Sequence, residues 1–141
     1  MKFLLDTNVI SEPQKPHPSV AVERFLRGTR EESLHLSVMT IAELYRGLAL
    51  MGAGRRRVSL ERWIIGALPE RFGDRLLPVT IPTAALWGDV MARSRQGGLN
   101  ISVMDGFLAA TAAVHDLAVV TRNTRHFAGL GLTVINPWDE A

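Results

Sequence analysis

The chain has 141 residues, of which 47% are apolar, with a formal net charge of +2 and no cysteine. This length favours one compact domain, residues 1–141, whose core needs no disulfide, and the lack of cysteine excludes thiolate nucleophiles and cysteine-held zinc. No apolar run approaches the roughly 20 residues of a membrane span, and Asp6 interrupts the first run too early for a signal peptide, so we expect a cytoplasmic protein without membrane contact.

Apolar runs and helical spacing alternate along the chain, and glycines or prolines separate them. Strands are expected at 2–5, 34–38, 75–80, 117–121 and 132–136, and helices at 19–28, 40–52, 57–68, 82–98 and 102–116. The fourth helix opens at Pro82, and the third is expected to end at Pro69. This alternation predicts an α/β three-layer sandwich with a short, mainly parallel central sheet flanked by helices.

Acidic and amide side chains follow the predicted strands. Asp6 ends the first strand, Glu43 lies about one turn into the helix after the second, and Asn123 follows the strand at 117–121. Because ligands of open parallel sheets bind at the carboxyl ends of the strands, we expect these three side chains along one edge. Asp105 joins them only if its helix also begins at that edge.

Each acid also has a purely structural interpretation. Asp6 fits an Asx-turn, and the spacings Thr40 to Glu43 and Ser102 to Asp105 fit a capping box. Three acids at one edge would, however, repel each other and raise their pKa values unless a cation intervenes. Hard oxygen ligands without a neighbouring cysteine or histidine suit Mg²⁺ or Mn²⁺.

Other constellations are weaker. The four histidines share no ligand spacing, and we expect surface or packing roles for them. A phosphatase with an aspartate nucleophile typically shows D-x-D, whereas Asn8 stands at the second position here. A receiver domain would need a lysine late in the chain, and lysine occurs only at positions 2 and 15.

Four stretches together resemble the PIN-domain ribonucleases, and closely the VapC/FitB-type toxins of bacterial type II toxin–antitoxin pairs. They are "LLDTNVISE" at 4–12, "SVMTIAELYRG" at 37–47, "VMDGFLAATAAVHDLAVVTRNTRHF" at 103–127 and "VINPW" at 134–138. The resemblance spans nearly the whole chain, in the family's order and spacing. It implies a PIN-like fold and a metal-dependent endoribonuclease that uses Mg²⁺ or Mn²⁺. It also implies an RNA substrate, a cognate antitoxin that blocks the site, and homodimers.

The resemblance also assigns roles to residues. The family's three acids fall on Asp6, Glu43 and Asp105 as catalytic residues, with Asp6 and Asp105 as metal ligands. The polar residues around the family's site match Thr7, Asn8 and Thr121, which are expected to support it together with Asn123.

Asn123 departs from the family pattern, because many members carry a fourth acid there. An amide can accept a hydrogen bond from a metal-bound water but brings no charge, which leaves open whether one or two ions bind. The same departure keeps open an alternative: a catalytically weak or inactive PIN module that binds RNA or a partner protein.

Overall fold

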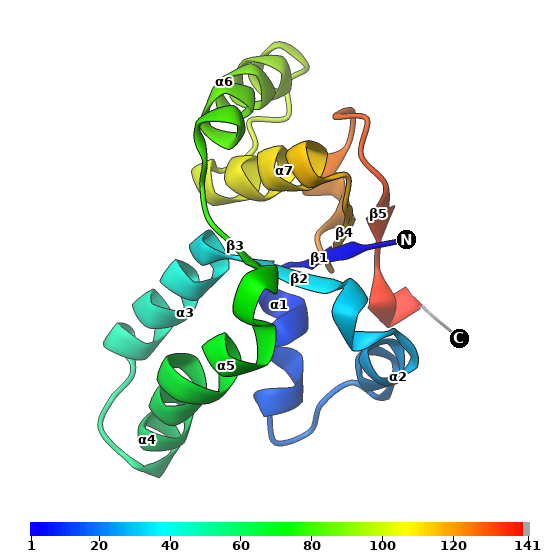
Figure 1. Ribbon diagram of the computed structural model, residues 1–141. Helices are drawn as coiled ribbons and strands as arrows, with labels where there is room; N and C mark the ends of the chain where they lie inside the picture. The colour runs from blue at the N-terminus through cyan, green and yellow to red at the C-terminus, as the bar shows by residue number, and fades with distance from the viewer. Residues whose placement is uncertain (140–141) are drawn as a thin grey trace.

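A parallel β-sheet of five short strands forms the centre of the molecule (Figure 1). The structure, a computed structural model, describes residues 1–139. The strands lie in the order β3-β2-β1-β4-β5, and every neighbouring pair is parallel. Their bounds are Phe3–Leu5 for β1, Leu34–Ser37 for β2, Leu76–Leu77 for β3, Ala118–Val120 for β4 and Val134–Ile135 for β5.

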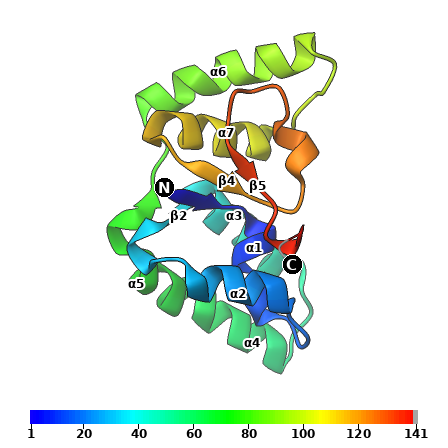
Figure 2. The same cartoon turned by 90° about the vertical axis from the view of Figure 1, so that its right-hand side faces the viewer.

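Helices cover both faces of this sheet and make three layers. Figure 2 shows α7 against one face with α6 outside it, and helices α1 to α5 lie on the opposite side. The helices are α1 Thr7–Ile10, α2 Val20–Gly28, α3 Val38–Leu50, α4 Arg55–Arg62, α5 Leu68–Phe72, α6 Ile81–Gln96 and α7 Val103–His115. The expected α/β sandwich is thereby confirmed. The single domain of residues 1–141 stays a prediction, and residues 140 and 141 lie outside the described part.

Successive residues of the central strands are buried against opposite helix layers. Leu4 and Val119 belong to the core cluster that contains the buried face of α7. Leu5 and Val120 belong to the second cluster, with residues of α2, α3 and α5. Because both faces of the sheet are covered, β1 and β4 appear in the sequence as continuous apolar runs. This packing fixes the carboxyl ends of the two strands.

Three helices begin at hydroxyl caps close to their expected starts. The Ser19, Thr80 and Ser102 side chains each accept a hydrogen bond from a main-chain N–H in the first turn of α2, α6 and α7. Pro82 lies in the first turn of α6, where the N–H that proline lacks would have no helical partner. Local cap chemistry therefore sets these helix starts.

The expected start of α3 at Thr40 is wrong. The helix begins at Val38, and the Ser37 hydroxyl accepts from the Met39 N–H at 3.0 Å. Ser37 is also the last residue of β2, so the chain passes from strand to helix without a loop. Thr40 therefore lies inside the helix, fully buried, and its hydroxyl has no hydrogen-bond partner within residues 1–139.

The expected helix end at Pro69 is also wrong, because helical backbone continues from α4 to the end of α5. A π-helical segment, Trp63–Ala67, joins the two helices, and the Leu68 N–H bonds the Trp63 carbonyl. Pro69 then stands in the first turn of α5. The wider π turn accommodates a residue without an N–H donor, which an uninterrupted α-helix would not.

The two edge strands are shorter than expected. β3 stops at Leu77, directly before Pro78, which has no N–H to donate to the sheet. β5 is likewise only two residues long. The short helix α1 was not expected, since four residues are too few to show helical periodicity.

Within residues 1–139, no helix is both long enough and apolar enough to cross a membrane.

Candidate functional site

The predicted acids lie on elements that meet at the carboxyl edge of the sheet. Asp6 directly follows β1 and caps α1, and Glu43 lies in α3, which follows β2. The helix α7 runs back toward the start of β4, so its first turn, which contains Asp105, begins at the same edge. The condition set for Asp105 from the sequence is therefore met.

Uncharged donors hold the carboxylate of Asp6, which is only 5% exposed. The Thr7 N–H donates to Oδ1 at 2.7 Å, and the buried Thr121 hydroxyl donates to Oδ2 at 2.7 Å. The Asn8 amide is 3.5 Å from Oδ2. The bond to Thr7 is local, but it comes from the next residue and not from the main-chain N–H two residues on that an Asx-turn would use. The bond to Thr121 joins β1 to β4, which a purely local role of Asp6 does not require.

The environment of Asp6 raises its pKa to about 6. Burial is the largest cause, and the nearby charges of Asp105 and Glu43 raise the pKa further, whereas the hydrogen bonds from Thr121 and Thr7 lower it. Within residues 1–139, no basic side chain forms an ion pair with Asp6. The site is thus a buried acid near two others without a compensating cation.

Thr7 connects the first acid to the second. Its hydroxyl donates to Glu43 Oε1 at 2.8 Å, while its main-chain N–H donates to Asp6. The capping box expected from Thr40 to Glu43 does not form, because Ser37 caps the helix and Glu43 lies in its second turn. The Glu43 carboxylate is therefore directed at the end of β1 by a side-chain contact.

Asp105 contacts His126, for which the sequence predicts only a surface or packing role. The Asp105 N–H donates to the Ser102 hydroxyl at 3.1 Å, as expected from the capping box. Its carboxylate turns elsewhere, because Oδ2 lies 3.0 Å from His126 Nδ1. The one available signal was that His126 lies in the same "TRNTRHF" stretch as Asn123. No sequence spacing relates residues 21 positions apart on different elements.

The remaining polar residues gather at the end of β4. The Asn123 N–H donates to the Thr121 hydroxyl at 3.0 Å, and Asn8 accepts from the Arg122 N–H at 3.3 Å. The Asn123 side chain is exposed and makes no hydrogen bond to another residue in the described part of the chain. The structure thus ties Thr7, Asn8 and Thr121 to Asp6, and Asn123 only through its main chain.

The donor set suits a hard cation held by few protein ligands. Among residues 1–139, no three histidine, aspartate or glutamate side chains are arranged to hold an ion together. Two carboxylates with several waters are nevertheless a common way to bind Mg²⁺. The buried, uncompensated charge of Asp6 beside Asp105 fits a cation of this kind, which would relieve the repulsion that raises the Asp6 pKa.

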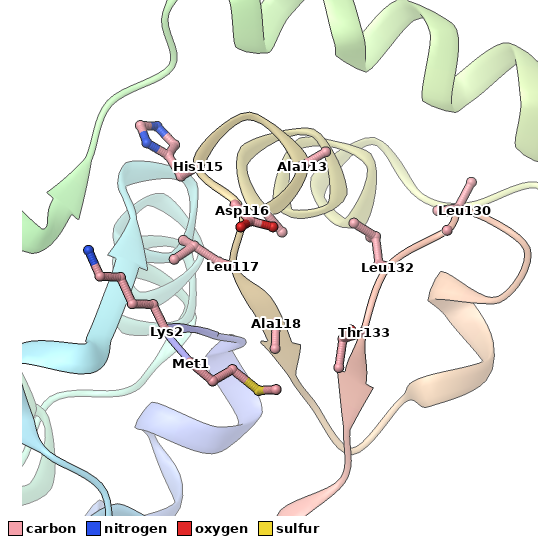
Figure 3. A pocket seen from close by; sticks show the side chains of 12 residues that line it. Met1, Lys2, Ala113, His115, Asp116, Leu117, Ala118, Leu130, Leu132 and Thr133 are labelled. Carbon is pink, nitrogen blue, oxygen red and sulfur yellow. The ribbon is translucent and has the colours of Figure 1, made fainter.

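A groove adjoins the acids on one side. It has a volume of about 300 Å³ and includes Thr7 and Glu43 in its wall, with apolar side chains from α3, α4 and the π-helical segment. A separate cavity of about 820 Å³ lies at the opposite, amino edge of the sheet, beside Lys2, Asp116 and Thr133 (Figure 3). Of Asp6, Glu43 and Asp105, only Glu43 lines the first space, and none of the three lines the second.

The fold is a parallel α/β sandwich, and acids lie at the carboxyl edge of its central strands. Comparisons with known proteins show the family to which the chain belongs. A family model described as PIN domain matches residues 3–131. The VapC ribonuclease Y4jK of Sinorhizobium fredii is 41% identical over 139 residues, covering 99% of this chain and 99% of that protein. Toxin FitB of Neisseria gonorrhoeae is 38% identical over 138 residues, covering 98% and 99%.

A solved structure agrees with the sequence relatives. The crystal structure of FitAcB from Neisseria gonorrhoeae superposes with a TM-score of 0.92 at 38% identity, covering 98% of this chain and 99% of that chain. The chain belongs to the PIN-domain family. Its resemblance to the VapC/FitB-type toxins, expected from the four sequence stretches, is confirmed.

Proposed function

We propose that this protein is a metal-dependent endoribonuclease and the toxin of a toxin–antitoxin pair. The observation that carries the proposal is the acidic site: buried Asp6 lies near Asp105 and Glu43 and has no basic partner within residues 1–139. The relatives named VapC ribonuclease and Toxin FitB support the activity and the biological role. The substrate is RNA in the cytoplasm.

Asp6 and Asp105 are the proposed metal ligands, with waters completing the shell of Mg²⁺ or Mn²⁺. A bound ion supplies activation of a water molecule and neutralises charge on the scissile phosphate. Thr7 and Thr121 fix the two oxygens of Asp6, so the carboxylate needs no rearrangement to bind.

Glu43 is the proposed acceptor of the proton from the attacking water. The Thr7 hydroxyl holds Oε1, which leaves Oε2 for the proton. Water attacks phosphorus in line, the bond to the 3′-oxygen breaks, and that oxygen takes a proton from solvent. The products are a 3′-hydroxyl and a 5′-phosphate.

Cleavage of structured RNAs by wild type and Asp6→Asn, with Mg²⁺ or with a chelator, tests the proposal. We expect wild type to cut only with the metal, and the variant to fold normally but lose most of its cleavage rate, because an amide brings no charge to hold the ion. Asp89→Asn on the exposed face of α6 is the matched control. Equal cleavage by wild type and Asp6→Asn would contradict the assignment.

One feature favours a second function. Because Asn123 stands where many relatives of this type carry an acid, a PIN module that binds RNA or a partner without cutting is the alternative. The same assay separates the two functions, since this module would retain RNA in a binding assay and show no metal-dependent products.

The proposal includes a protein partner. An antitoxin segment would occupy the 300 Å³ groove and insert a basic side chain toward Glu43 and Asp6. Arginine suits this position, because its planar fork can bond two carboxylate oxygens at once. A homodimer is the proposed assembly of the toxin itself.

A further inference from the structure

His126 is held against Asp105 by a hydrogen bond of fixed polarity. Its Nδ1 lies 3.0 Å from Asp105 Oδ2, and an ionised carboxylate can only accept, so Nδ1 carries the hydrogen. The His126 side chain is 55% exposed, whereas that of Asp105 is 17% exposed. The contact therefore joins a surface group to a half-buried acid of the proposed site.

The main chain around His126 is held in place by a buried neighbour and by a hydrogen bond, so its contact with Asp105 is not that of a freely moving surface side chain. The next residue, Phe127, is 1% exposed and packs in the same core cluster as Leu108 and Ala109 of α7. The His126 N–H also donates to the Asn123 carbonyl at 3.0 Å, within a short 3₁₀ turn. The turn is thus fixed to the helix that carries Asp105, and it presents the imidazole to that carboxylate.

We propose that His126 is a positioning residue for the metal site. Its Nδ1–H occupies Oδ2 and holds one orientation of the Asp105 carboxylate, which leaves Oδ1 for the cation. This inference rests on the proposed function, because it assigns Asp105 as a metal ligand. The positioning role requires only the hydrogen bond from Nδ1 to Asp105, which the His126 ring can donate in its neutral or its charged form.

The physical reason is that a ligand oriented before the ion arrives loses less conformational freedom on binding. Partners that hold metal ligands in this way typically contribute 10–100-fold to metal affinity. An exposed ion pair contributes little to folding and nothing to metal binding. If His126 positions Asp105, its removal should therefore weaken metal binding. If the two residues form only a surface pair, metal affinity should not change.

Calorimetric titration of the full-length protein with Mn²⁺ tests the inference, using wild type, His126→Ala, His126→Asn and His126→Gln. Asparagine carries its amide nitrogen at the same reach from the main chain as Nδ1, whereas the glutamine amide lies one carbon further out. We expect His126→Ala to weaken Mn²⁺ binding about tenfold, His126→Asn to recover most of it, and His126→Gln to recover less. The control His115→Ala, at the far end of α7, should bind as wild type.

The outcomes separate this inference from the function on which it rests. Wild-type affinity in His126→Ala, together with lost binding in Asp105→Asn, would overturn the role of His126 and leave the metal site standing. Weak binding in both His126→Ala and His126→Asn would show that the hydrogen bond is not what matters, and would also overturn it. If wild type bound no Mn²⁺, the metal site and this inference would both fail.

Discussion

At the scale of single residues, the same groups make several hydrogen bonds around the acids. Thr7 donates its N–H to Asp6, the N-cap of α1, and its hydroxyl to Glu43. Thr121 donates to Asp6 and accepts from the Asn123 main chain. Because every donor to Asp6 is uncharged, the protein orients the carboxylate without neutralising it. The remaining charge is what a cation, or a basic side chain of a partner, would compensate.

The raised pKa of Asp6 makes stability depend on pH. Its value is about 6 in the fold against 3.8 for the unfolded chain. The folded state therefore holds the proton more tightly, so this favourable contribution is present below pH 3.8 and is lost as pH rises through 6. Two pKa units correspond to roughly 3 kcal/mol, which the ionised, metal-free site costs at neutral pH.

We accordingly expect Asp6→Asn to be more stable than wild type at pH 7–8 in the presence of a chelator, by up to roughly 3 kcal/mol. The difference should shrink as pH falls toward 4. Urea unfolding of both proteins across this range measures it, with Asp89→Asn as the control. A destabilised Asp6→Asn at pH 7 would mean that the cap and the Thr121 bond outweigh the cost of the charge.

Asn123 offers the opposite test, since Asn123→Asp adds a carboxylate at the end of β4. Metal affinity of oxygen sites rises with ligand charge, so we expect tighter Mn²⁺ binding and a metal–activity curve at lower concentration. The variant should also be less stable without metal, because four acids then repel one another. Titration calorimetry and RNA cleavage check this. Superimposable curves would place the Asn123 side chain beyond reach of the ion.

At the scale of elements, the local sequence predicted the positions of strands and helices where local interactions determine them. Apolar runs located the strands, and helical spacing together with Pro82 located α2, α6 and α7. Thr40 failed as a cap because Ser37, three residues earlier, offered the same chemistry directly at the strand end. Pro69 failed as a stop because a π turn absorbed it.

The sequence predicts the place of a site residue where that residue directly follows a strand or lies near the start of the next helix. The edge at which Asp6 and Glu43 lie followed from β1 and β2. The contact of Asp105 with His126 did not, because it depends on how the turn after β4 packs on α7. Contacts between residues distant in sequence require the tertiary packing, which no local spacing encodes.

The pair of helices α6 and α7 gives a prediction at this scale. A Cβ on Gly106 would lie 2.5 Å from Met91 Sδ and 3.0 Å from Trp87 Nε1. Met91 can adjust, but Trp87 is stacked on Phe107 with ring centroids 5.0 Å apart. We therefore expect Gly106→Ala to cost about 1–3 kcal/mol, as overpacking does.

The matched control for that variant is Gly88→Ala in α6, where a Cβ would meet nothing within 4 Å. It should gain up to about 1 kcal/mol from helix propensity alone. Urea unfolding measures both variants. If Gly106→Ala were also stabilised, α6 would be free to move away from α7, and the first turn that carries Asp105 would be less firmly held than the packing indicates.

At the scale of the whole molecule, an acidic site beside an apolar groove favours a partner that combines a hydrophobic segment with a basic side chain. The groove contributes burial of apolar area, and Asp6 and Glu43 contribute charges that no basic side chain in residues 1–139 pairs. Binding of such a partner would compete with both metal and RNA. Such a partner would therefore inhibit through the same acids that the proposed mechanism uses.

We expect a small protein encoded beside this chain to co-purify with it and to suppress RNA cleavage through an inserted arginine. Replacing that arginine by glutamate should weaken the complex by at least tenfold and restore cleavage, because like charges would then face Asp6 and Glu43. Asp6→Asn in the toxin should reduce the effect of the replacement, since one of the repelling charges is gone. Affinities of the four toxin–antitoxin combinations give the coupling directly. Additive effects would mean that the arginine binds elsewhere and that the partner inhibits by covering the groove alone.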